Sequence, residues 1–111
     1  MLGKSSLTNQ YKINLTQKAY GDLRDIYSYI KEELHTKSSA LKVIDEIENR
    51  IMLLKDYPEI GTFVKDEVLL KKGYRKLIVN NYIALYLIDD NRKIVNIIRV
   101  VYGKRDYLEL V

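Results

Sequence analysis

The first regular pattern of apolar and polar residues lies in "YKINL", where Tyr11, Ile13 and Leu15 alternate with polar residues. A period of two is typical of a half-buried strand. Beyond Thr16, which is suited to cap a helix, apolar residues recur every three or four positions as far as Leu34. Such a stripe indicates an amphipathic helix, and most of its charged residues lie off the stripe.

A second apolar stripe follows the short polar break "HTKSS", in which Ser38 or Ser39 is expected to cap the next helix. Apolar residues at helical spacing then occupy positions 40–54. The helix is expected to stop at "DYPEIG", because Pro58 and Gly61 cannot continue it. Two helices of similar length with a brief link should fold back on each other as an antiparallel hairpin.

The period changes again after residue 72, where β-rich segments alternate with turn residues. Three strands are expected, at 74–79, 82–88 and 93–102, with turns at 80–81 and 89–92. The last strand is apolar on both sides apart from Asn96 and Arg99, which favours an interior place in the sheet.

The predicted order is therefore β-α-α-β-β-β. It describes an α+β fold in which a helical hairpin packs on one face of a mainly antiparallel, four-stranded sheet. A chain of 111 residues is long enough for one such domain. We expect a flexible segment at 1–10 and a single domain at 11–111.

Composition excludes several classes of function. There is no cysteine and only one histidine, so disulfides, thiolate metal sites and histidine-dependent triads are not expected. We expect no metal and no cofactor. The first ten residues lack the apolar stretch of a signal peptide, and no run reaches membrane-spanning length, so a cytoplasmic protein without a membrane partner is expected.

Charge is distributed unevenly along the chain. Residues 1–70 hold 10 Lys/Arg against 11 Asp/Glu, whereas residues 71–111 hold 9 against 4. The net charge of +4 therefore comes from the last third, where it begins with "KKGYRK". A one-sided positive field indicates an anionic partner, and its alternative is solubility charge that happens to cluster.

The basic residues of this third are interleaved with tyrosines. Arginine and lysine can clamp phosphates, and tyrosine can stack on a base or transfer a proton. A structural role is the alternative for several of them: Tyr86 is expected in the core, Arg99 can pair with an acidic neighbour, and Arg105 with Asp106. Arg75 and Lys76 are expected on opposite faces of one strand.

Four segments in this order resemble the RelE/ParE superfamily of bacterial type II toxins. They are "YKINLTQKAYGDLRDIYSYI", "LLKDYPEIG", "GYRKLIVNNYIALYLIDD" and "IIRVVYGKRDYLEL". The resemblance spans residues 11 to about 107 and implies a growth-inhibiting toxin that is neutralised by a cognate antitoxin. It also implies one of two targets: RelE-like members cut mRNA on the ribosome without metal, and ParE-like members inhibit DNA gyrase.

The RelE pattern of site residues is matched in part. Arg75 stands at the first cation of the second strand, and Arg105 in "GKRD" fits the cation after the last strand. Ile83 replaces the arginine expected after Tyr82, and Val111 falls nearest the expected terminal tyrosine, so Tyr107 would have to serve instead. Leu77 holds the next same-face position of the strand.

The resemblance thus implies three candidate catalytic residues, Arg75, Arg105 and Tyr107. Residues expected to bind nucleic acid or a protein partner are Lys71, Lys72, Lys76, Tyr82, Arg99, Tyr102 and Lys104. The partners expected are the antitoxin and either the ribosome with mRNA or gyrase. Two other functions remain open: a decayed, non-toxic module that binds the antitoxin or acts as a corepressor, and a general RNA-binding domain.

Overall fold

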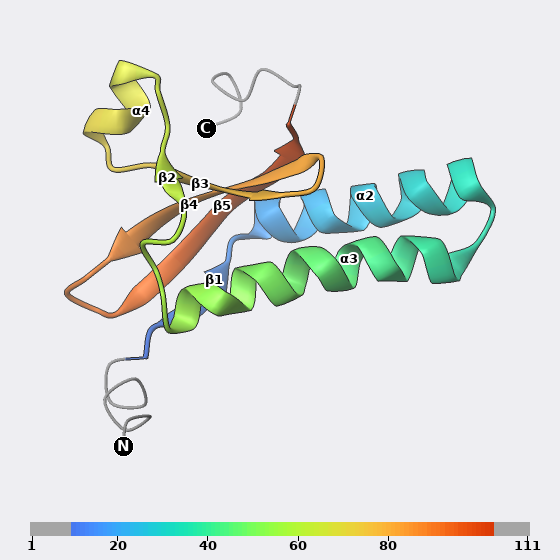
Figure 1. Ribbon diagram of the computed structural model, residues 1–111, viewed down its shortest axis with the longest axis horizontal. Helices are drawn as coiled ribbons and strands as arrows, with labels where there is room; N and C mark the ends of the chain where they lie inside the picture. Colours follow the sequence, from blue (N-terminus) through green and yellow to red (C-terminus); the bar gives the residue numbers. More distant parts are fainter. Residues whose placement is uncertain (1–9, 104–111) are drawn as a thin grey trace.

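The computed structural model describes residues 10–103 and has the predicted α+β architecture (Figure 1). Two long helices lie side by side against the sheet. In chain order the elements are β1 (Lys12–Leu15), α2 (Gln17–Leu34), α3 (Lys37–Met52), the 3₁₀ turn η1 (Leu53–Lys55), β2 (Thr62–Phe63), α4 (Glu67–Lys71), β3 (Arg75–Val79), β4 (Tyr82–Asp89) and β5 (Ile94–Tyr102).

The sheet has five strands, in the order β1-β5-β4-β3-β2. β1 runs parallel to β5 and the other neighbours are antiparallel. The prediction of four strands is wrong by one, because β2 was not expected. β2 contains only Thr62 and Phe63, both exposed, which is too short for a period-two pattern to show. β5 lies between β1 and β4, as its apolar sequence predicted.

Threonines cap both long helices. The Thr16 hydroxyl accepts a hydrogen bond from the Ala19 N–H at 3.1 Å, as predicted. The second helix is capped by Thr36, which accepts from the Ser39 N–H at 3.0 Å, and not by Ser38 or Ser39. The reason is that α2 ends with His35 in the left-handed region, which makes Thr36 the first extended residue after the break.

Apolar side chains cover both faces of the sheet. The main core lies between the helical hairpin and one face, and Leu23, Ile47 and Tyr86 are among its buried members. A second cluster on the other face joins Leu69 of α4 to Ile83, Leu85 and Val101, together with Val64. α4 was not predicted, since one turn and a half of helix is too short to show an apolar stripe.

Candidate functional site

Arg75, the first predicted catalytic residue, opens β3 and is held by the loop that precedes β2. Its Nη1 donates hydrogen bonds to the carbonyls of Gly61 at 2.8 Å and Glu59 at 3.3 Å. The guanidinium also lies 3.9 Å from the centre of the Phe63 ring, a cation–π contact. Only 14% of the side chain is exposed. The guanidinium is therefore occupied by the protein's own backbone and ring.

The same loop is tied to the sheet by Tyr86. The Tyr86 hydroxyl donates to the Pro58 carbonyl at 2.7 Å and accepts from the Gly61 N–H at 3.0 Å. A Cβ at Gly61 would lie 2.5 Å from this hydroxyl and 2.6 Å from the Lys76 carbonyl, so only glycine fits. Burial is the main cause that raises the pKa of Tyr86. The hydroxyl therefore stays protonated and keeps both bonds at neutral pH.

Arg99 of β5 is paired with Asp22 of α2. The guanidinium donates to the carboxylate twice, from Nε at 2.8 Å and from Nη2 at 2.7 Å, a bidentate ion pair. The two side chains are 15% and 12% exposed. The hydrogen bond to Asp22 is the main cause that raises the pKa of Arg99. The prediction that Arg99 could pair with an acidic neighbour is confirmed.

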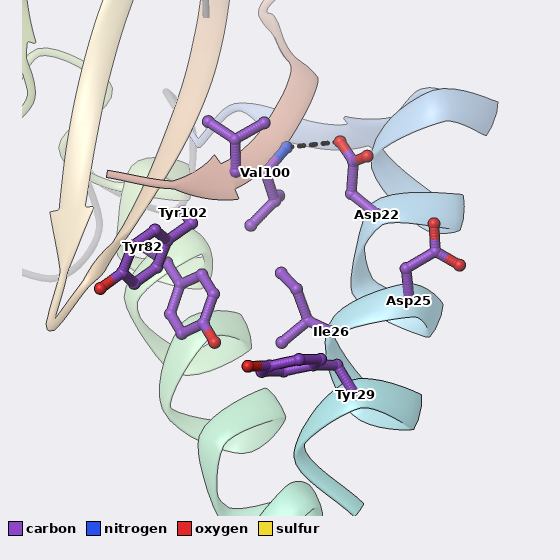
Figure 2. Close-up of a pocket in the computed structure, with 8 residues that line it drawn as sticks. Asp22, Asp25, Ile26, Tyr29, Tyr82, Val100 and Tyr102 are labelled. Atoms are coloured by element: carbon purple, nitrogen blue, oxygen red, sulfur yellow. Dashed lines mark hydrogen bonds between the residues drawn. The ribbon is translucent and has the colours of Figure 1, made fainter. Parts of the chain in front are cut away.

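Asp22 also completes the edge of β5. β1 pairs with β5 only as far as Ile97, and within residues 10–103 no strand pairs with the edge beyond it. There the Thr16 hydroxyl donates to the Ile98 carbonyl at 3.1 Å, and the Val100 N–H donates to Asp22 at 2.8 Å (Figure 2). The Asp22 carboxylate of α2 thus binds both the backbone edge of β5 and the Arg99 guanidinium.

A groove of about 610 Å³ lies beside this pair, between α2 and the adjoining ends of β4 and β5. In Figure 2 the rings of Tyr29, Tyr82 and Tyr102 stand on its walls, and Asp25 lies on the helix above Tyr29. The Tyr82 and Tyr102 rings meet edge to face, with centroids 6.0 Å apart. The residues that line the groove are Asp22, Asp25, Ile26, Tyr29, Tyr82, Val100, Val101 and Tyr102.

The surroundings of Tyr82 in this groove affect its hydroxyl group. The pKa of Tyr82 is raised, first by burial and then by the nearby hydroxyls of Tyr102 and Tyr29. The Tyr82 hydroxyl is therefore neutral at physiological pH and can donate or accept a hydrogen bond. Chemically, the groove offers aromatic surface, hydroxyl groups and carboxylate oxygens.

Three of the predicted cations lie on the side of the sheet that α4 covers. Lys71 ends α4 and Lys72 is its C-cap, and both are exposed. Lys76 pairs with Leu85, which belongs to the α4 cluster, whereas Arg75 pairs with Tyr86 of the main core. Cross-strand partners share a face, so Arg75 and Lys76 lie on opposite faces, as predicted.

The predicted site residues are thus distributed over three places. Tyr82 and Tyr102 line the groove, and Arg99 is paired with Asp22 at its side. The three lysines lie around α4. Arg75 is bonded to the loop that precedes β2. Lys104, Arg105 and Tyr107 lie outside the described residues. Sequence reasoning missed Asp22, Asp25 and Tyr29, because charged and aromatic residues off the apolar stripe of a helix are usually solvated.

Other kinds of site are not found in the part of the chain that the structure describes. No group of three or more His, Asp or Glu residues within 10–103 could hold a metal ion. Among these residues no helix is both long and apolar enough to cross a membrane.

Residues 13–107 match the family model described as the ParE toxin of the type II toxin–antitoxin system parDE. The chain belongs to this family. The match covers most of the sequence and includes every strand and helix described above apart from Lys12, the first residue of β1. No curated protein matches this ParE-family sequence.

Solved structures of the superfamily share the fold of this ParE-family chain. The chromosomal ParDE toxin–antitoxin system of P. aeruginosa matches with a TM-score of 0.69 and 24% identity, over 85% of this chain and 97% of that one. The toxin–antitoxin complex RelBE2 of Mycobacterium tuberculosis matches at 0.59 and 23%, over 84% and 91%. A mutant of the E. coli toxin RelE in the free state matches at 0.59 and 14%, over 86% and 85%.

Proposed function

We propose that this toxin inhibits growth by acting on DNA gyrase, and that it does not cleave mRNA on the ribosome. The observation that carries the proposal is that Arg75 and Arg99, two cations of the described sheet that could hold a phosphate, already have partners inside the protein. Arg75 is bonded to the Gly61 carbonyl and Arg99 to the Asp22 carboxylate.

RNA cleavage without a metal needs cations that are free to stabilise charge on the phosphate. Loss of one well-placed donor commonly lowers a rate on the order of 10²–10³-fold. Ile83 stands where the RelE pattern has an arginine, and it is only 7% exposed beneath α4. The apolar Ile83 side chain offers no positive charge. Inhibition of gyrase through a protein–protein contact places no such demand on the chain.

We further propose that a cognate antitoxin neutralises the toxin. Membership of a type II toxin family supports such a partner, as does the likeness to the ParDE system of P. aeruginosa and to the RelBE2 complex of M. tuberculosis. The described residues expose large apolar side chains, including Tyr29 and Tyr102, that a protein partner could cover.

The test compares two reactions of the purified toxin. In the first, gyrase supercoils relaxed plasmid in the presence of increasing toxin; in the second, programmed ribosomes carry a labelled mRNA. We expect loss of supercoiling and an intact mRNA. Ribosome-dependent cuts would overturn the proposal. Their loss in Arg75→Ala but not in Lys37→Ala, the control for a change of charge on the helical hairpin, would assign them to Arg75.

A decayed module that only binds an antitoxin is distinguished by expression of the chain alone in bacteria. The proposal requires that growth stops. Normal growth with accumulation of folded protein would reject a toxin with either target.

A further inference from the structure

Among residues 10–103, the side chains that line the groove between α2 and the ends of β4 and β5 differ in charge from the molecule as a whole. The chain carries a net charge of +4, yet these described lining residues include two aspartates and no cation. Arg99 compensates the charge of Asp22. Asp25 has no ion-pair partner within residues 10–103, so its carboxylate charge is not compensated by any residue that the structure describes.

The other walls are aromatic. Tyr29 is 63% exposed and lies on α2 below Asp25, while Tyr82 and Tyr102 stand on the opposite side of the groove (Figure 2). A carboxylate beside several aromatic rings is a favourable setting for a guanidinium or ammonium group, which pairs with the carboxylate and stacks on the rings. Arginine suits such a setting best, because its planar group does both.

We infer that this groove binds a segment of the antitoxin that carries an arginine or lysine between apolar residues. The inference rests on the proposed antitoxin partner and names the chemistry of its contact. The cation would lie against Asp25 and the Tyr29 ring, and the apolar neighbours would cover Ile26, Val101 and Tyr102. About 610 Å³ is enough for a few side chains of such a segment.

Charge complementarity favours this occupant over a nucleic acid. A phosphate backbone would meet the Asp25 carboxylate in a groove whose described lining residues include no cation. It also favours a basic segment over an acidic one. The groove would therefore attract positively charged groups of a partner, and the lysines around α4 would attract negatively charged ones.

The test measures the affinity of the full-length toxin for its antitoxin protein by calorimetry. Asp25→Lys should weaken binding on the order of tenfold at low salt, because it places a like charge against the cation. Asp45→Lys is the matched control, since Asp45 is also an exposed aspartate on a long helix but lies outside the groove. It should leave the affinity unchanged.

Aromatic contact is tested in the same way. Tyr29→Ala should weaken binding several-fold, as truncation of a tyrosine at an interface centre commonly does. Tyr20→Ala is the control, because Tyr20 lies on the same helix and is equally exposed at 63%. Each arginine and lysine of the antitoxin is then replaced by glutamate. The replacement that weakens binding to the natural toxin should restore binding to Asp25→Lys.

Two results would overturn the inference. One is an unchanged affinity for both groove variants. The other is a lower thermal midpoint of the free Asp25→Lys toxin together with unchanged antitoxin binding, which would mean that Asp25 stabilises the toxin itself and does not contact the antitoxin. The supercoiling assay decides the proposed target separately, because it uses the natural toxin without antitoxin.

Discussion

Tyr86 shows how one side chain can fix a loop that sequence patterns leave undefined. Its ring is fully buried in the main core, and its hydroxyl emerges beside the "DYPEIG" loop, where it has one acceptor and one donor. The loop in turn supplies the carbonyls that hold Arg75. The position of a candidate functional arginine therefore depends on a buried tyrosine.

We predict that Tyr86→Phe lowers the free energy of unfolding by about 1–3 kcal/mol, because the Pro58 carbonyl and the Gly61 N–H each lose a partner. Urea unfolding followed by circular dichroism measures the change. Tyr20→Phe, at an exposed position, should cost nothing measurable. Equal stabilities of the two variants would contradict the role given to the buried hydroxyl.

Sequence reasoning identified the burial of Tyr86 but not its partners. Apolar residues on both sides of Tyr86 indicate a core position, whereas Pro58 and Gly61 lie 28 and 25 residues away along the chain. The partner of Arg99 is even more distant along the chain. An acidic partner was expected, but Asp22 is 77 residues distant, and nothing in a single sequence selects it from the other carboxylates.

At the scale of elements, the two threonine caps differ in the number of side-chain hydrogen bonds that they make. Thr16 caps α2 and also donates to the Ile98 carbonyl of β5, so it joins a helix to the sheet. Thr36 caps α3 in the exposed link between the helices, and its hydroxyl accepts from the Ser39 N–H. The Thr36 hydroxyl therefore makes one hydrogen bond, and the Thr16 hydroxyl makes two.

We predict that Thr36→Ala costs about 1 kcal/mol, the usual value of an N-cap. Thr16→Ala should cost about 1 kcal/mol more, because the Ile98 carbonyl at the partly buried sheet edge also loses a donor. Chemical denaturation of both variants gives the comparison. The assignment of the second role to Thr16 fails if the two substitutions prove equally costly.

Elements with a clear periodic pattern could be predicted, including the four-residue β1 with its strict alternation, whereas β2 and α4 could not. The 18 residues of α2 and the nine of β5 each repeat their period several times. β2 has two residues and is stabilised by pairing with β3. α4 has five residues and is stabilised by packing in the second core cluster. Their formation depends on tertiary contacts, which local patterns do not contain.

At the scale of the whole molecule, the charge asymmetry of the sequence is only partly a property of its surface. The excess of cations in residues 71–111 was expected to form one positive side. Arg75 and Arg99 instead turn toward partners in the protein, and the exposed Lys71 and Lys72 remain beside α4. Counting charges along a chain does not reveal which of them are already paired.

We predict that Lys71→Glu with Lys72→Glu raises the toxin concentration needed for half-inhibition of gyrase several-fold at low salt, because an attractive field is reversed. The difference should shrink as salt screens it. Lys37→Glu with Lys42→Glu makes the same change of charge on α3 and should have little effect. An equal effect of both pairs would indicate that net charge alone matters.

The double task of Asp22 constrains how this protein can change during evolution or in the laboratory. A variant such as Asp22→Ala, which breaks the ion pair with Arg99, would also strip the Val100 N–H of its acceptor. Asp22→Asn would remove the ion pair and keep an oxygen for the Val100 N–H. Among single substitutions at position 22, those that keep an acceptor are therefore the ones that preserve this strand edge.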